Sequence, residues 1–199
     1  MPEIGQGQKA ALLEAYTATV SLLPSSLRTE FPIIGGTALI ILGSTRLTVD
    51  VDFAVSAAAL NAFSIAAAND PRFLKGAVDD WTYICQGEGI HDVNVPLEFL
   101  QMDGGFVPNI KVVKPAGEGF RASLGELARM KANTYAARDD RKDRDDFEFL
   151  LRKMEETAEG FEGVELQEED LENMEAAAVD CPSKPVNLLK RLLKKSGHQ

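Results

Sequence analysis

The chain has 199 residues, of which 45% are hydrophobic and 26% are charged, a composition typical of one globular domain with a short appendage. Its net charge of −10 argues against an extended nucleic-acid-binding surface, because a protein that holds long nucleic acid by its phosphates needs a basic face. No apolar run reaches the roughly 18 residues of a membrane span, and the N-terminus lacks a secretory pattern, so we expect a cytoplasmic protein without a membrane partner.

The first 55 residues alternate between helical and extended patterns. Apolar spacing predicts a helix over 8–23, and the short apolar run 31–34 predicts a buried strand that stops at Gly35-Gly36. A second helix is expected over 37–42, and strict alternation predicts a strand over 47–55. The side chains expected toward the core of that strand are Leu47, Val49, Val51, Phe53 and Val55.

The next part of the chain continues the alternation of helix and strands. Ser56 is placed to cap an alanine-rich helix that ends near Asn69. Three further strands are expected, over 81–85, 93–100 and 110–113. Proline cannot donate a ladder hydrogen bond, so Pro96 predicts that its strand lies at a sheet edge or begins there.

Helical patterns dominate the C-terminal part. Ser123 and Glu126 have the spacing of a capping box, and they open a predicted helix that runs to about Arg138. A second helix is expected over 142–156. The apolar spacing of both segments therefore predicts consecutive helices that follow the strands.

The last 45 residues change in composition. Residues 155–180 contain 11 acidic side chains and no basic one, which indicates either a solvated helix or a partly disordered segment. A short basic amphipathic helix is expected over 186–195. We therefore predict a main domain over 1–157 and an appendage, acidic and then basic, over 158–199.

Asp50 and Asp52 are the first candidates for chemistry. Two carboxylates at i and i+2 of a strand point to the same face, about 7 Å apart. Their negative charges repel each other, and a divalent cation removes that conflict. Mg²⁺ prefers carboxylate oxygens together with substrate phosphates, so the pair is either a metal clamp or a solvated strand face.

Gly35, Gly36 and Thr37 form a second candidate between a strand and a helix. Glycines let the backbone approach a phosphate closely. The N-terminus of the following helix would offer free N–H groups to the same phosphate. The alternative is a tight turn with no ligand.

The run from Gly35 to Asp52 resembles the first motif of the DNA polymerase beta-like nucleotidyltransferase superfamily, and most of all its AbiEii-type toxin branch. Arg46 and Thr48 match the arginine and small hydroxyl residue that precede an Asp-hydrophobic-Asp step in that branch. The segments 127–138 and 142–151 resemble the two helices that follow in the same branch. The resemblance covers about residues 31–152 and implies an α/β (α+β) nucleotidyltransferase fold, a small mixed β-sheet with packed helices plus C-terminal helices.

The superfamily also places a third carboxylate on a neighbouring strand. We assign Glu98 to this position, because it stands alone on an otherwise apolar strand where an unpaired charge would be costly. Most relatives have aspartate here. Asp92 and Asp103 are the rival candidates.

The resemblance implies a role for each matched residue. Asp50 and Asp52 would hold two Mg²⁺ (or Mn²⁺) ions, and Glu98 would share a metal and help to activate the attacking hydroxyl. Gly35, Gly36 and Thr37 would cradle the triphosphate of an NTP.

Three other side chains receive roles from the same resemblance. Lys131 would contact the phosphates, and Asp143 would be a base or would orient Lys131. Arg46 would contact phosphate or pair with Asp50.

The resulting functional prediction is a Mg²⁺-dependent enzyme that moves a nucleoside monophosphate from an NTP to a hydroxyl and releases pyrophosphate. The acceptor is left open between RNA such as tRNA, a protein side chain and a small molecule. The alternative is a catalytically inactive module with the same fold that binds nucleotide or another protein.

Overall fold

The computed structural model describes residues 3–76, 80–102 and 109–198, which form two compact units. The first unit comprises residues 1–109 and 113–121, and the second comprises 110–112 and 122–199. The two helices that follow the strands therefore pack with the acidic and basic segments in the second unit. Among the described residues, no helix is long and apolar enough to cross a membrane.

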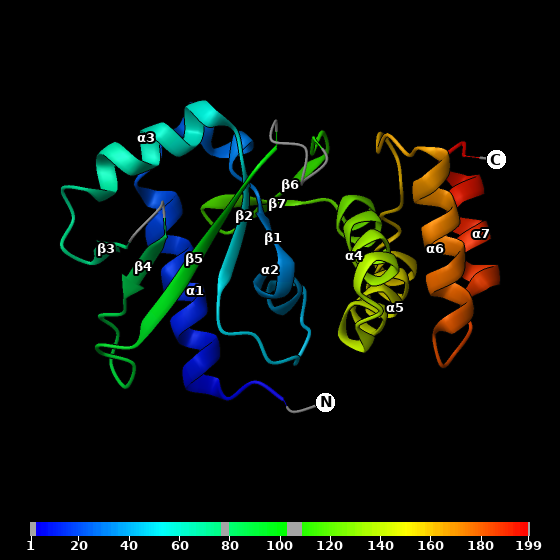
Figure 1. The fold of residues 1–199 in the computed structure, drawn as a ribbon, viewed down its shortest axis with the longest axis horizontal. Helices are drawn as coiled ribbons and strands as arrows, with labels where there is room; N and C mark the ends of the chain where they lie inside the picture. The colour runs from blue at the N-terminus through cyan, green and yellow to red at the C-terminus, as the bar shows by residue number, and fades with distance from the viewer. Residues whose placement is uncertain (1–2, 77–79, 103–108, 199) are drawn as a thin grey trace. The chain divides into compact units, whose positions relative to one another are not determined.

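The first unit is built on a mixed sheet with strand order β3-β4-β5-β2-β1-β7-β6 (Figure 1). The strands are β1 (Ile33–Ile34), β2 (Val51–Val55), β3 (Phe73–Lys75), β4 (Trp81–Ile84), β5 (Asn94–Gln101), β6 (Val113–Ala116) and β7 (Gly119–Ala122). The helices are α1 (Gln6–Ser21), the 3₁₀ helix η1 (Ser25–Glu30), α2 (Gly35–Ile41) and α3 (Ala57–Ala67). This mixed sheet with packed helices confirms the predicted fold class.

One face of the sheet carries an aromatic core. Phe53 of β2 lies 4.8 Å from Phe31 and 5.8 Å from Phe99 of β5, measured between ring centroids. Phe63 of α3 lies 4.9 Å from Phe99, and Tyr16 of α1 lies 6.1 Å from Phe53. Successive side chains of a strand point to opposite faces, so burying these rings turns the neighbours of Phe53 and Phe99 to the other face.

The strand predicted over 47–55 is wrong in its first half, because β2 begins only at Val51. The side chains of Leu47 and Val49 are 43% and 58% exposed, and Thr48 is buried between them. The reason is a lack of partners. β1 has two residues and pairs with β2 only at Phe53 and Asp52, and the ladder with β5 starts at Val51.

The prediction that the strand of Pro96 lies at a sheet edge or begins there is also wrong, since β5 lies between β4 and β2 and begins at Asn94. Pro96 pairs with Thr82 of β4, and it precedes the first residue of β5 that pairs with β2. Its missing N–H therefore coincides with the start of the β2 ladder. Proline limits where this ladder begins, and it does not place the strand at the edge.

Two strand assignments near the ends of the sheet also differ from the prediction. Residues 110–112 are irregular, and the strands that follow are β6 and β7. The backbone N–H of Lys111 donates to the carboxylate of Glu126, and Val112 accepts from Ser123, so this segment belongs to the second unit. β3 was missed because three residues are too few to show alternation.

The second unit contains α4 (Leu124–Arg138), α5 (Arg141–Thr157), α6 (Glu168–Asp180) and α7 (Val186–Lys195). These bounds confirm the helices predicted from Ser123 to about Arg138, over 142–156 and over 186–195. The Ser123 hydroxyl caps α4 by accepting from the N–H of Glu126, as predicted. The Glu126 carboxylate is fully buried, and one of its oxygens pairs with Arg129 at 2.5 Å while the other accepts from the backbone N–H of Lys111.

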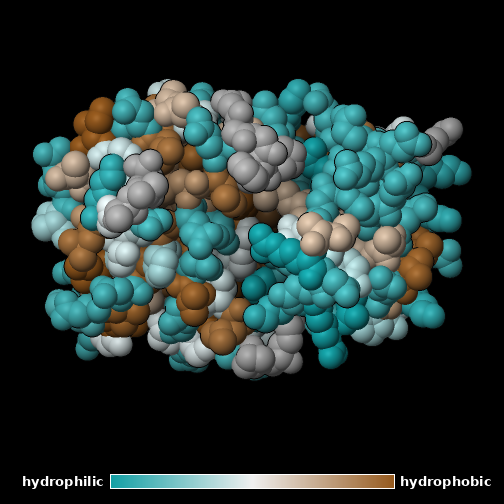
Figure 2. Space-filling view, in the orientation of Figure 1, coloured by the Kyte–Doolittle hydropathy of each residue, from teal (hydrophilic) through white to brown (hydrophobic). Residues whose placement is uncertain are grey.

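The acidic segment forms a helix over 168–180. α6 begins with a capping box between Gln167 and Asp170, and it buries Met174, Ala177 and Ala178. Asn133 of α4 donates to Asp170 at 2.6 Å. Only a narrow stripe of α6 is buried, in keeping with the hydrophilic surface that Figure 2 shows over this unit. The helical alternative therefore holds for residues 168–180, whereas residues 158–167 are irregular.

Candidate metal site

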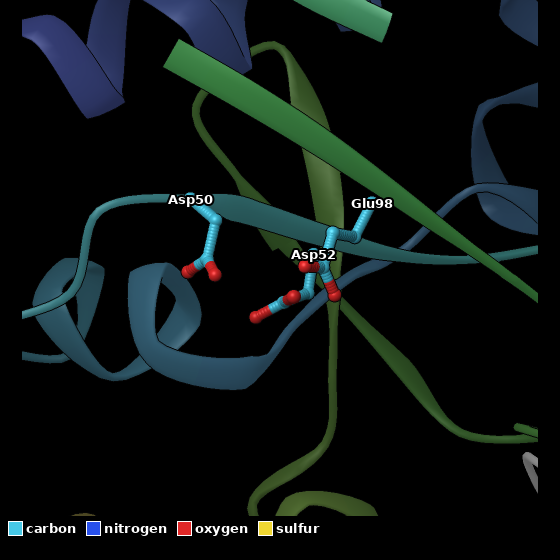
Figure 3. A group of neighbouring side chains, drawn as sticks. All are labelled: Asp50, Asp52 and Glu98. Atoms are coloured by element: carbon cyan, nitrogen blue, oxygen red, sulfur yellow. The ribbon is translucent and has the colours of Figure 1, made fainter. Parts of the chain in front are cut away.

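Three carboxylates, Asp50, Asp52 and Glu98, lie close together (Figure 3). Strand alternation places Asp52 and Glu98 on the sheet face opposite Phe53 and Phe99. Asp52 of β2 pairs with Glu98 of the parallel strand β5, and Asp50 directly precedes β2. One oxygen from each side chain lies within 4.8 Å of the others. Asp50 and Asp52 are half-buried and Glu98 is exposed. The structure thus brings together the three residues that the sequence analysis assigned to metal.

Glu98 reaches this position for a different reason from the one expected. Its side chain is exposed, and in β5 it follows an alternation in which Val95 and Leu97 are buried while Asn94 and Pro96 are exposed. The expectation of a charge on an apolar strand is therefore wrong, because one face of β5 is open. Its parallel register with Asp52 places Glu98 in the group.

The two rival carboxylates have different outcomes. Asp92 is outside the group of three. It is exposed in a left-handed conformation with φ 63°, and its carboxylate lies 2.8 Å from the ring of His91. Asp103 lies outside the described residues. Among the described carboxylates, Glu98 is thus the one that joins Asp50 and Asp52.

The two glycines lie in the first turn of α2, directly against this group. Gly35 has a φ of +62°, and a Cβ there would lie 1.7 Å from Oδ2 of Asp52. A Cβ on Gly36 would lie 2.6 Å from the hydroxyl of Thr48. Both positions therefore require glycine, because side chains of the site occupy the space.

Two threonines hold Asp50 through hydrogen bonds. The buried hydroxyl of Thr37 donates to the main-chain carbonyl of Asp50 at 2.7 Å. The hydroxyl of Thr48 donates to the Oδ1 atom of Asp50, also at 2.7 Å. Sequence reasoning gave neither residue this role. The one sequence feature that could have indicated the role of Thr48 is its position two residues before Asp50, which places both side chains on the same face of an extended segment.

The donor set suits a hard divalent cation. All three ligands are carboxylates, and oxygen ligands of this kind favour Mg²⁺, Mn²⁺ or Ca²⁺ over the thiophilic metals. Three negative charges this close repel one another, and a bound cation offsets that repulsion. The space that Gly35 leaves for the Asp52 carboxylate fits the same conclusion. The site could therefore hold a divalent metal.

The other predicted residues have separate surroundings. Arg46 is half-buried in the segment between α2 and β2, where its side chain donates to the carbonyl of Leu47 and its backbone forms an isolated antiparallel β-bridge with Glu3. Lys131 lies in the second unit, where its amine is 2.7 Å from Asp143 and 2.9 Å from Asp146. These three side chains are at most 15% exposed, and their ion pairs link α4 to α5.

Comparison with known proteins places the fold. No protein-family model matches the sequence, and no curated protein matches it. The structure resembles that of an antigenic nucleotidyltransferase-like protein from Paracoccidioides brasiliensis, with a TM-score of 0.60, 15% sequence identity and 95% of each chain covered. The chain therefore has a nucleotidyltransferase-like fold.

Proposed function

We propose that this protein is a nucleotidyltransferase that moves a nucleoside monophosphate from an NTP to a hydroxyl acceptor, with Mg²⁺ or Mn²⁺ as its metal. The observation that carries the proposal is the group Asp50, Asp52 and Glu98, whose oxygens converge within 4.8 Å on two adjacent parallel strands. A nucleotidyltransferase-like fold supports it, because the fold narrows the chemistry that such a group would serve.

The three carboxylates divide the work by their positions. Asp50 and Asp52 are half-buried, Asp50 accepts a hydrogen bond from Thr48 and Asp52 lies against Gly35, so we assign both as metal ligands. A bound divalent ion would neutralise the charge of the triphosphate and of the leaving pyrophosphate. Glu98 is the exposed member, and we assign it to accept the proton of the attacking hydroxyl as the new bond to the α-phosphorus forms.

The triphosphate would be held beside this group. Gly35 and Gly36 leave the backbone of the first turn of α2 without side chains, and Arg46 follows on the segment that leads to Asp50. We assign the phosphates to these residues. Lys131 and Asp143 belong to the second unit, so their part in the same active site, like the AbiEii-type branch itself, stays a prediction from the sequence.

The class of the acceptor is inferred from the net charge of the protein and not from the geometry of the site. A net charge of −10 opposes contact with long nucleic acid, so the acceptor is a small molecule or a locally docked hydroxyl of a protein or of RNA such as tRNA. All three have the hydroxyl nucleophile that the reaction requires.

Label transfer tests the proposal. Purified protein is incubated with each α-³²P-labelled NTP, Mg²⁺ or Mn²⁺, and a cell extract that supplies RNA, protein and small molecules. We expect metal-dependent label on one acceptor class with the wild type, and none with the double variant Asp50→Asn/Asp52→Asn.

The other outcomes decide between the proposal and its alternative. Metal-dependent NTP binding without any transfer contradicts the enzyme and supports the nucleotide-binding module. A protein that neither binds NTP nor transfers label would contradict both the enzyme and the nucleotide-binding module.

A further inference from the structure

Three consecutive residues at the start of α2 each contact a different residue of the segment that leads into β2. Gly35 lies against the carboxylate of Asp52, Gly36 lies against Thr48, and Thr37 donates to the carbonyl of Asp50. The first turn of α2 is thus fitted to the side chains around the metal site. The contacts of this turn with Asp50, Asp52 and Thr48 lie within the first unit.

Thr48 has the most specific of these contacts. Its side chain is 8% exposed, and its hydroxyl donates to Oδ1 of Asp50 at 2.7 Å. Threonine is branched at Cβ and has few rotamers, so the hydroxyl is held in place. A hydrogen bond to one carboxylate oxygen limits rotation of the group and leaves the Oδ2 atom for a ligand.

Gly36 makes room for Thr48. A Cβ on Gly36 would lie 2.6 Å from the hydroxyl oxygen of Thr48 and 2.8 Å from its Cβ. Gly36 does not have a positive φ, so its backbone would accept alanine, and the three atoms nearest to the new Cβ would all belong to Thr48. Gly36 therefore has no side chain because the side chain of Thr48 occupies the space that a Cβ would need.

We propose that Thr48 is a positioning residue for the metal ligand Asp50, and that Gly36 is glycine in order to seat Thr48. This inference rests on the proposed metal-dependent function and deepens it. The Gly35-Gly36-Thr37 step then serves the carboxylates directly, whether or not its backbone also contacts phosphate. Mutation of a residue that orients a metal ligand typically costs about 10–100-fold in metal affinity or activity.

Metal binding without nucleotide tests this role. Mn²⁺ is titrated into the protein alone, and free Mn²⁺ is followed by electron paramagnetic resonance. Thr48→Val keeps the shape of the side chain but removes the hydroxyl, and we expect it to weaken Mn²⁺ binding about 10-fold. Thr48→Ser restores the donor and should remain within about twofold of the wild type. Thr17→Val, on the exposed face of α1, is the matched control.

A glycine variant tests the seat of Thr48 separately. We expect Gly36→Ala to weaken Mn²⁺ binding to a similar degree, and the double variant Gly36→Ala/Thr48→Val to lose less than the sum of both, because both act through one hydrogen bond. Gly5→Ala is the control, since a Cβ there would meet nothing within 4 Å. Normal Mn²⁺ binding by Gly36→Ala together with weakened NTP binding would overturn the seating role and leave a phosphate role alone.

The outcomes also separate this inference from the proposed function. Wild-type protein that does not bind Mn²⁺ contradicts the metal site itself, and the inference with it. Wild-type protein that binds Mn²⁺ with the same affinity as Thr48→Val overturns the inference alone. Melting curves identify any variant that fails to fold, and the Gly36→Ala titration then decides the matter independently.

Discussion

The buried carboxylates of the second unit and the group Asp50, Asp52 and Glu98 of the first unit have different partners. In the second unit, Glu126 pairs with Arg129, and Asp143 and Asp146 pair with Lys131, all with low exposure. In the first unit, Asp50 accepts from a neutral threonine, and two more carboxylates lie beside it. The ion pairs of Lys131 link α4 to α5, and the pair of Glu126 with Arg129 lies within α4. The three close carboxylates of the first unit instead repel one another, and a bound cation would offset that repulsion. Acidic residues alone therefore do not mark a site; their partners do.

The largest effect is expected on activity in the first unit. Asp52→Asn should lower nucleotide transfer by at least about 1,000-fold, because a metal ligand is lost. Its melting temperature should stay unchanged or rise, because the repulsion among the three carboxylates is reduced. Label transfer and thermal unfolding measure the two effects. Asp92→Asn is the control, since Asp92 lies outside the group; an Asp52→Asn variant that unfolds would show that the residue is structural.

In the second unit, the largest effect is expected on stability. Glu126→Gln leaves the buried Arg129 without its charge partner, which should lower the free energy of unfolding by about 3 kcal/mol. Urea unfolding followed by circular dichroism measures the change. Glu165→Gln breaks an exposed pair with Lys111 and should cost less than about 0.5 kcal/mol. Equal losses in the two variants would contradict the contrast between buried and exposed pairs.

Gly35→Ala tests how closely α2 fits the carboxylates. The new Cβ would lie 1.7 Å from Asp52 and would also force alanine into a left-handed conformation, so we expect a loss of about 2–3 kcal/mol in stability. Chemical unfolding provides the measurement. A variant as stable as the wild type would show that Asp52 moves away from Gly35 at little cost.

Two valines test where β2 begins. Val51 is fully buried, and Val51→Ala should cost about 2 kcal/mol. Val49 is 58% exposed, and Val49→Ala should change the free energy of unfolding by less than about 0.5 kcal/mol. Similar costs at both positions would support the strand over 47–55 that alternation predicted.

The smallest effect is expected on thiol chemistry, and it reports on each unit separately. Burial raises the pKa of Cys85 in the first unit to about 11 and that of Cys181 in the second to about 12. At pH 8 both thiols should therefore react with Ellman's reagent far more slowly than they do in the unfolded chain. In the Glu126→Gln variant, Cys181 should be labelled at lower urea than Cys85. Labelling of both cysteines at the same urea concentration would show that the units unfold together.

The helices of the second unit could be predicted closely, because their apolar spacing and caps are local signals. Val186–Lys195 and the start of α4 after Ser123 are examples. Asp50 and Asp52 could be proposed because their spacing of two residues and the Gly-Gly step before them together resemble a known motif. The resemblance could name Glu98, but the reason given for it, a lone charge on an apolar strand, was wrong. One face of β5 is exposed, and that exposure depends on what covers the sheet.

The contacts across the chain could not be predicted. The alternation of residues 47–55 was regular, yet β2 starts at Val51 because its neighbours offer no earlier partner. The hydrogen bond of Thr48 and its seat against Gly36 depend on how α2 folds back onto this segment. Such pairings are tertiary, and no local pattern contains them.

The most direct test of the central claim is a crystal structure of the protein with Mn²⁺ and a non-hydrolysable NTP analogue, with anomalous diffraction to locate the metal. The account predicts an anomalous peak within about 2.5 Å of oxygens from Asp50 and Asp52 and near Glu98, with the triphosphate beside it. A nucleotide bound elsewhere, or no peak at these three carboxylates, would contradict the account.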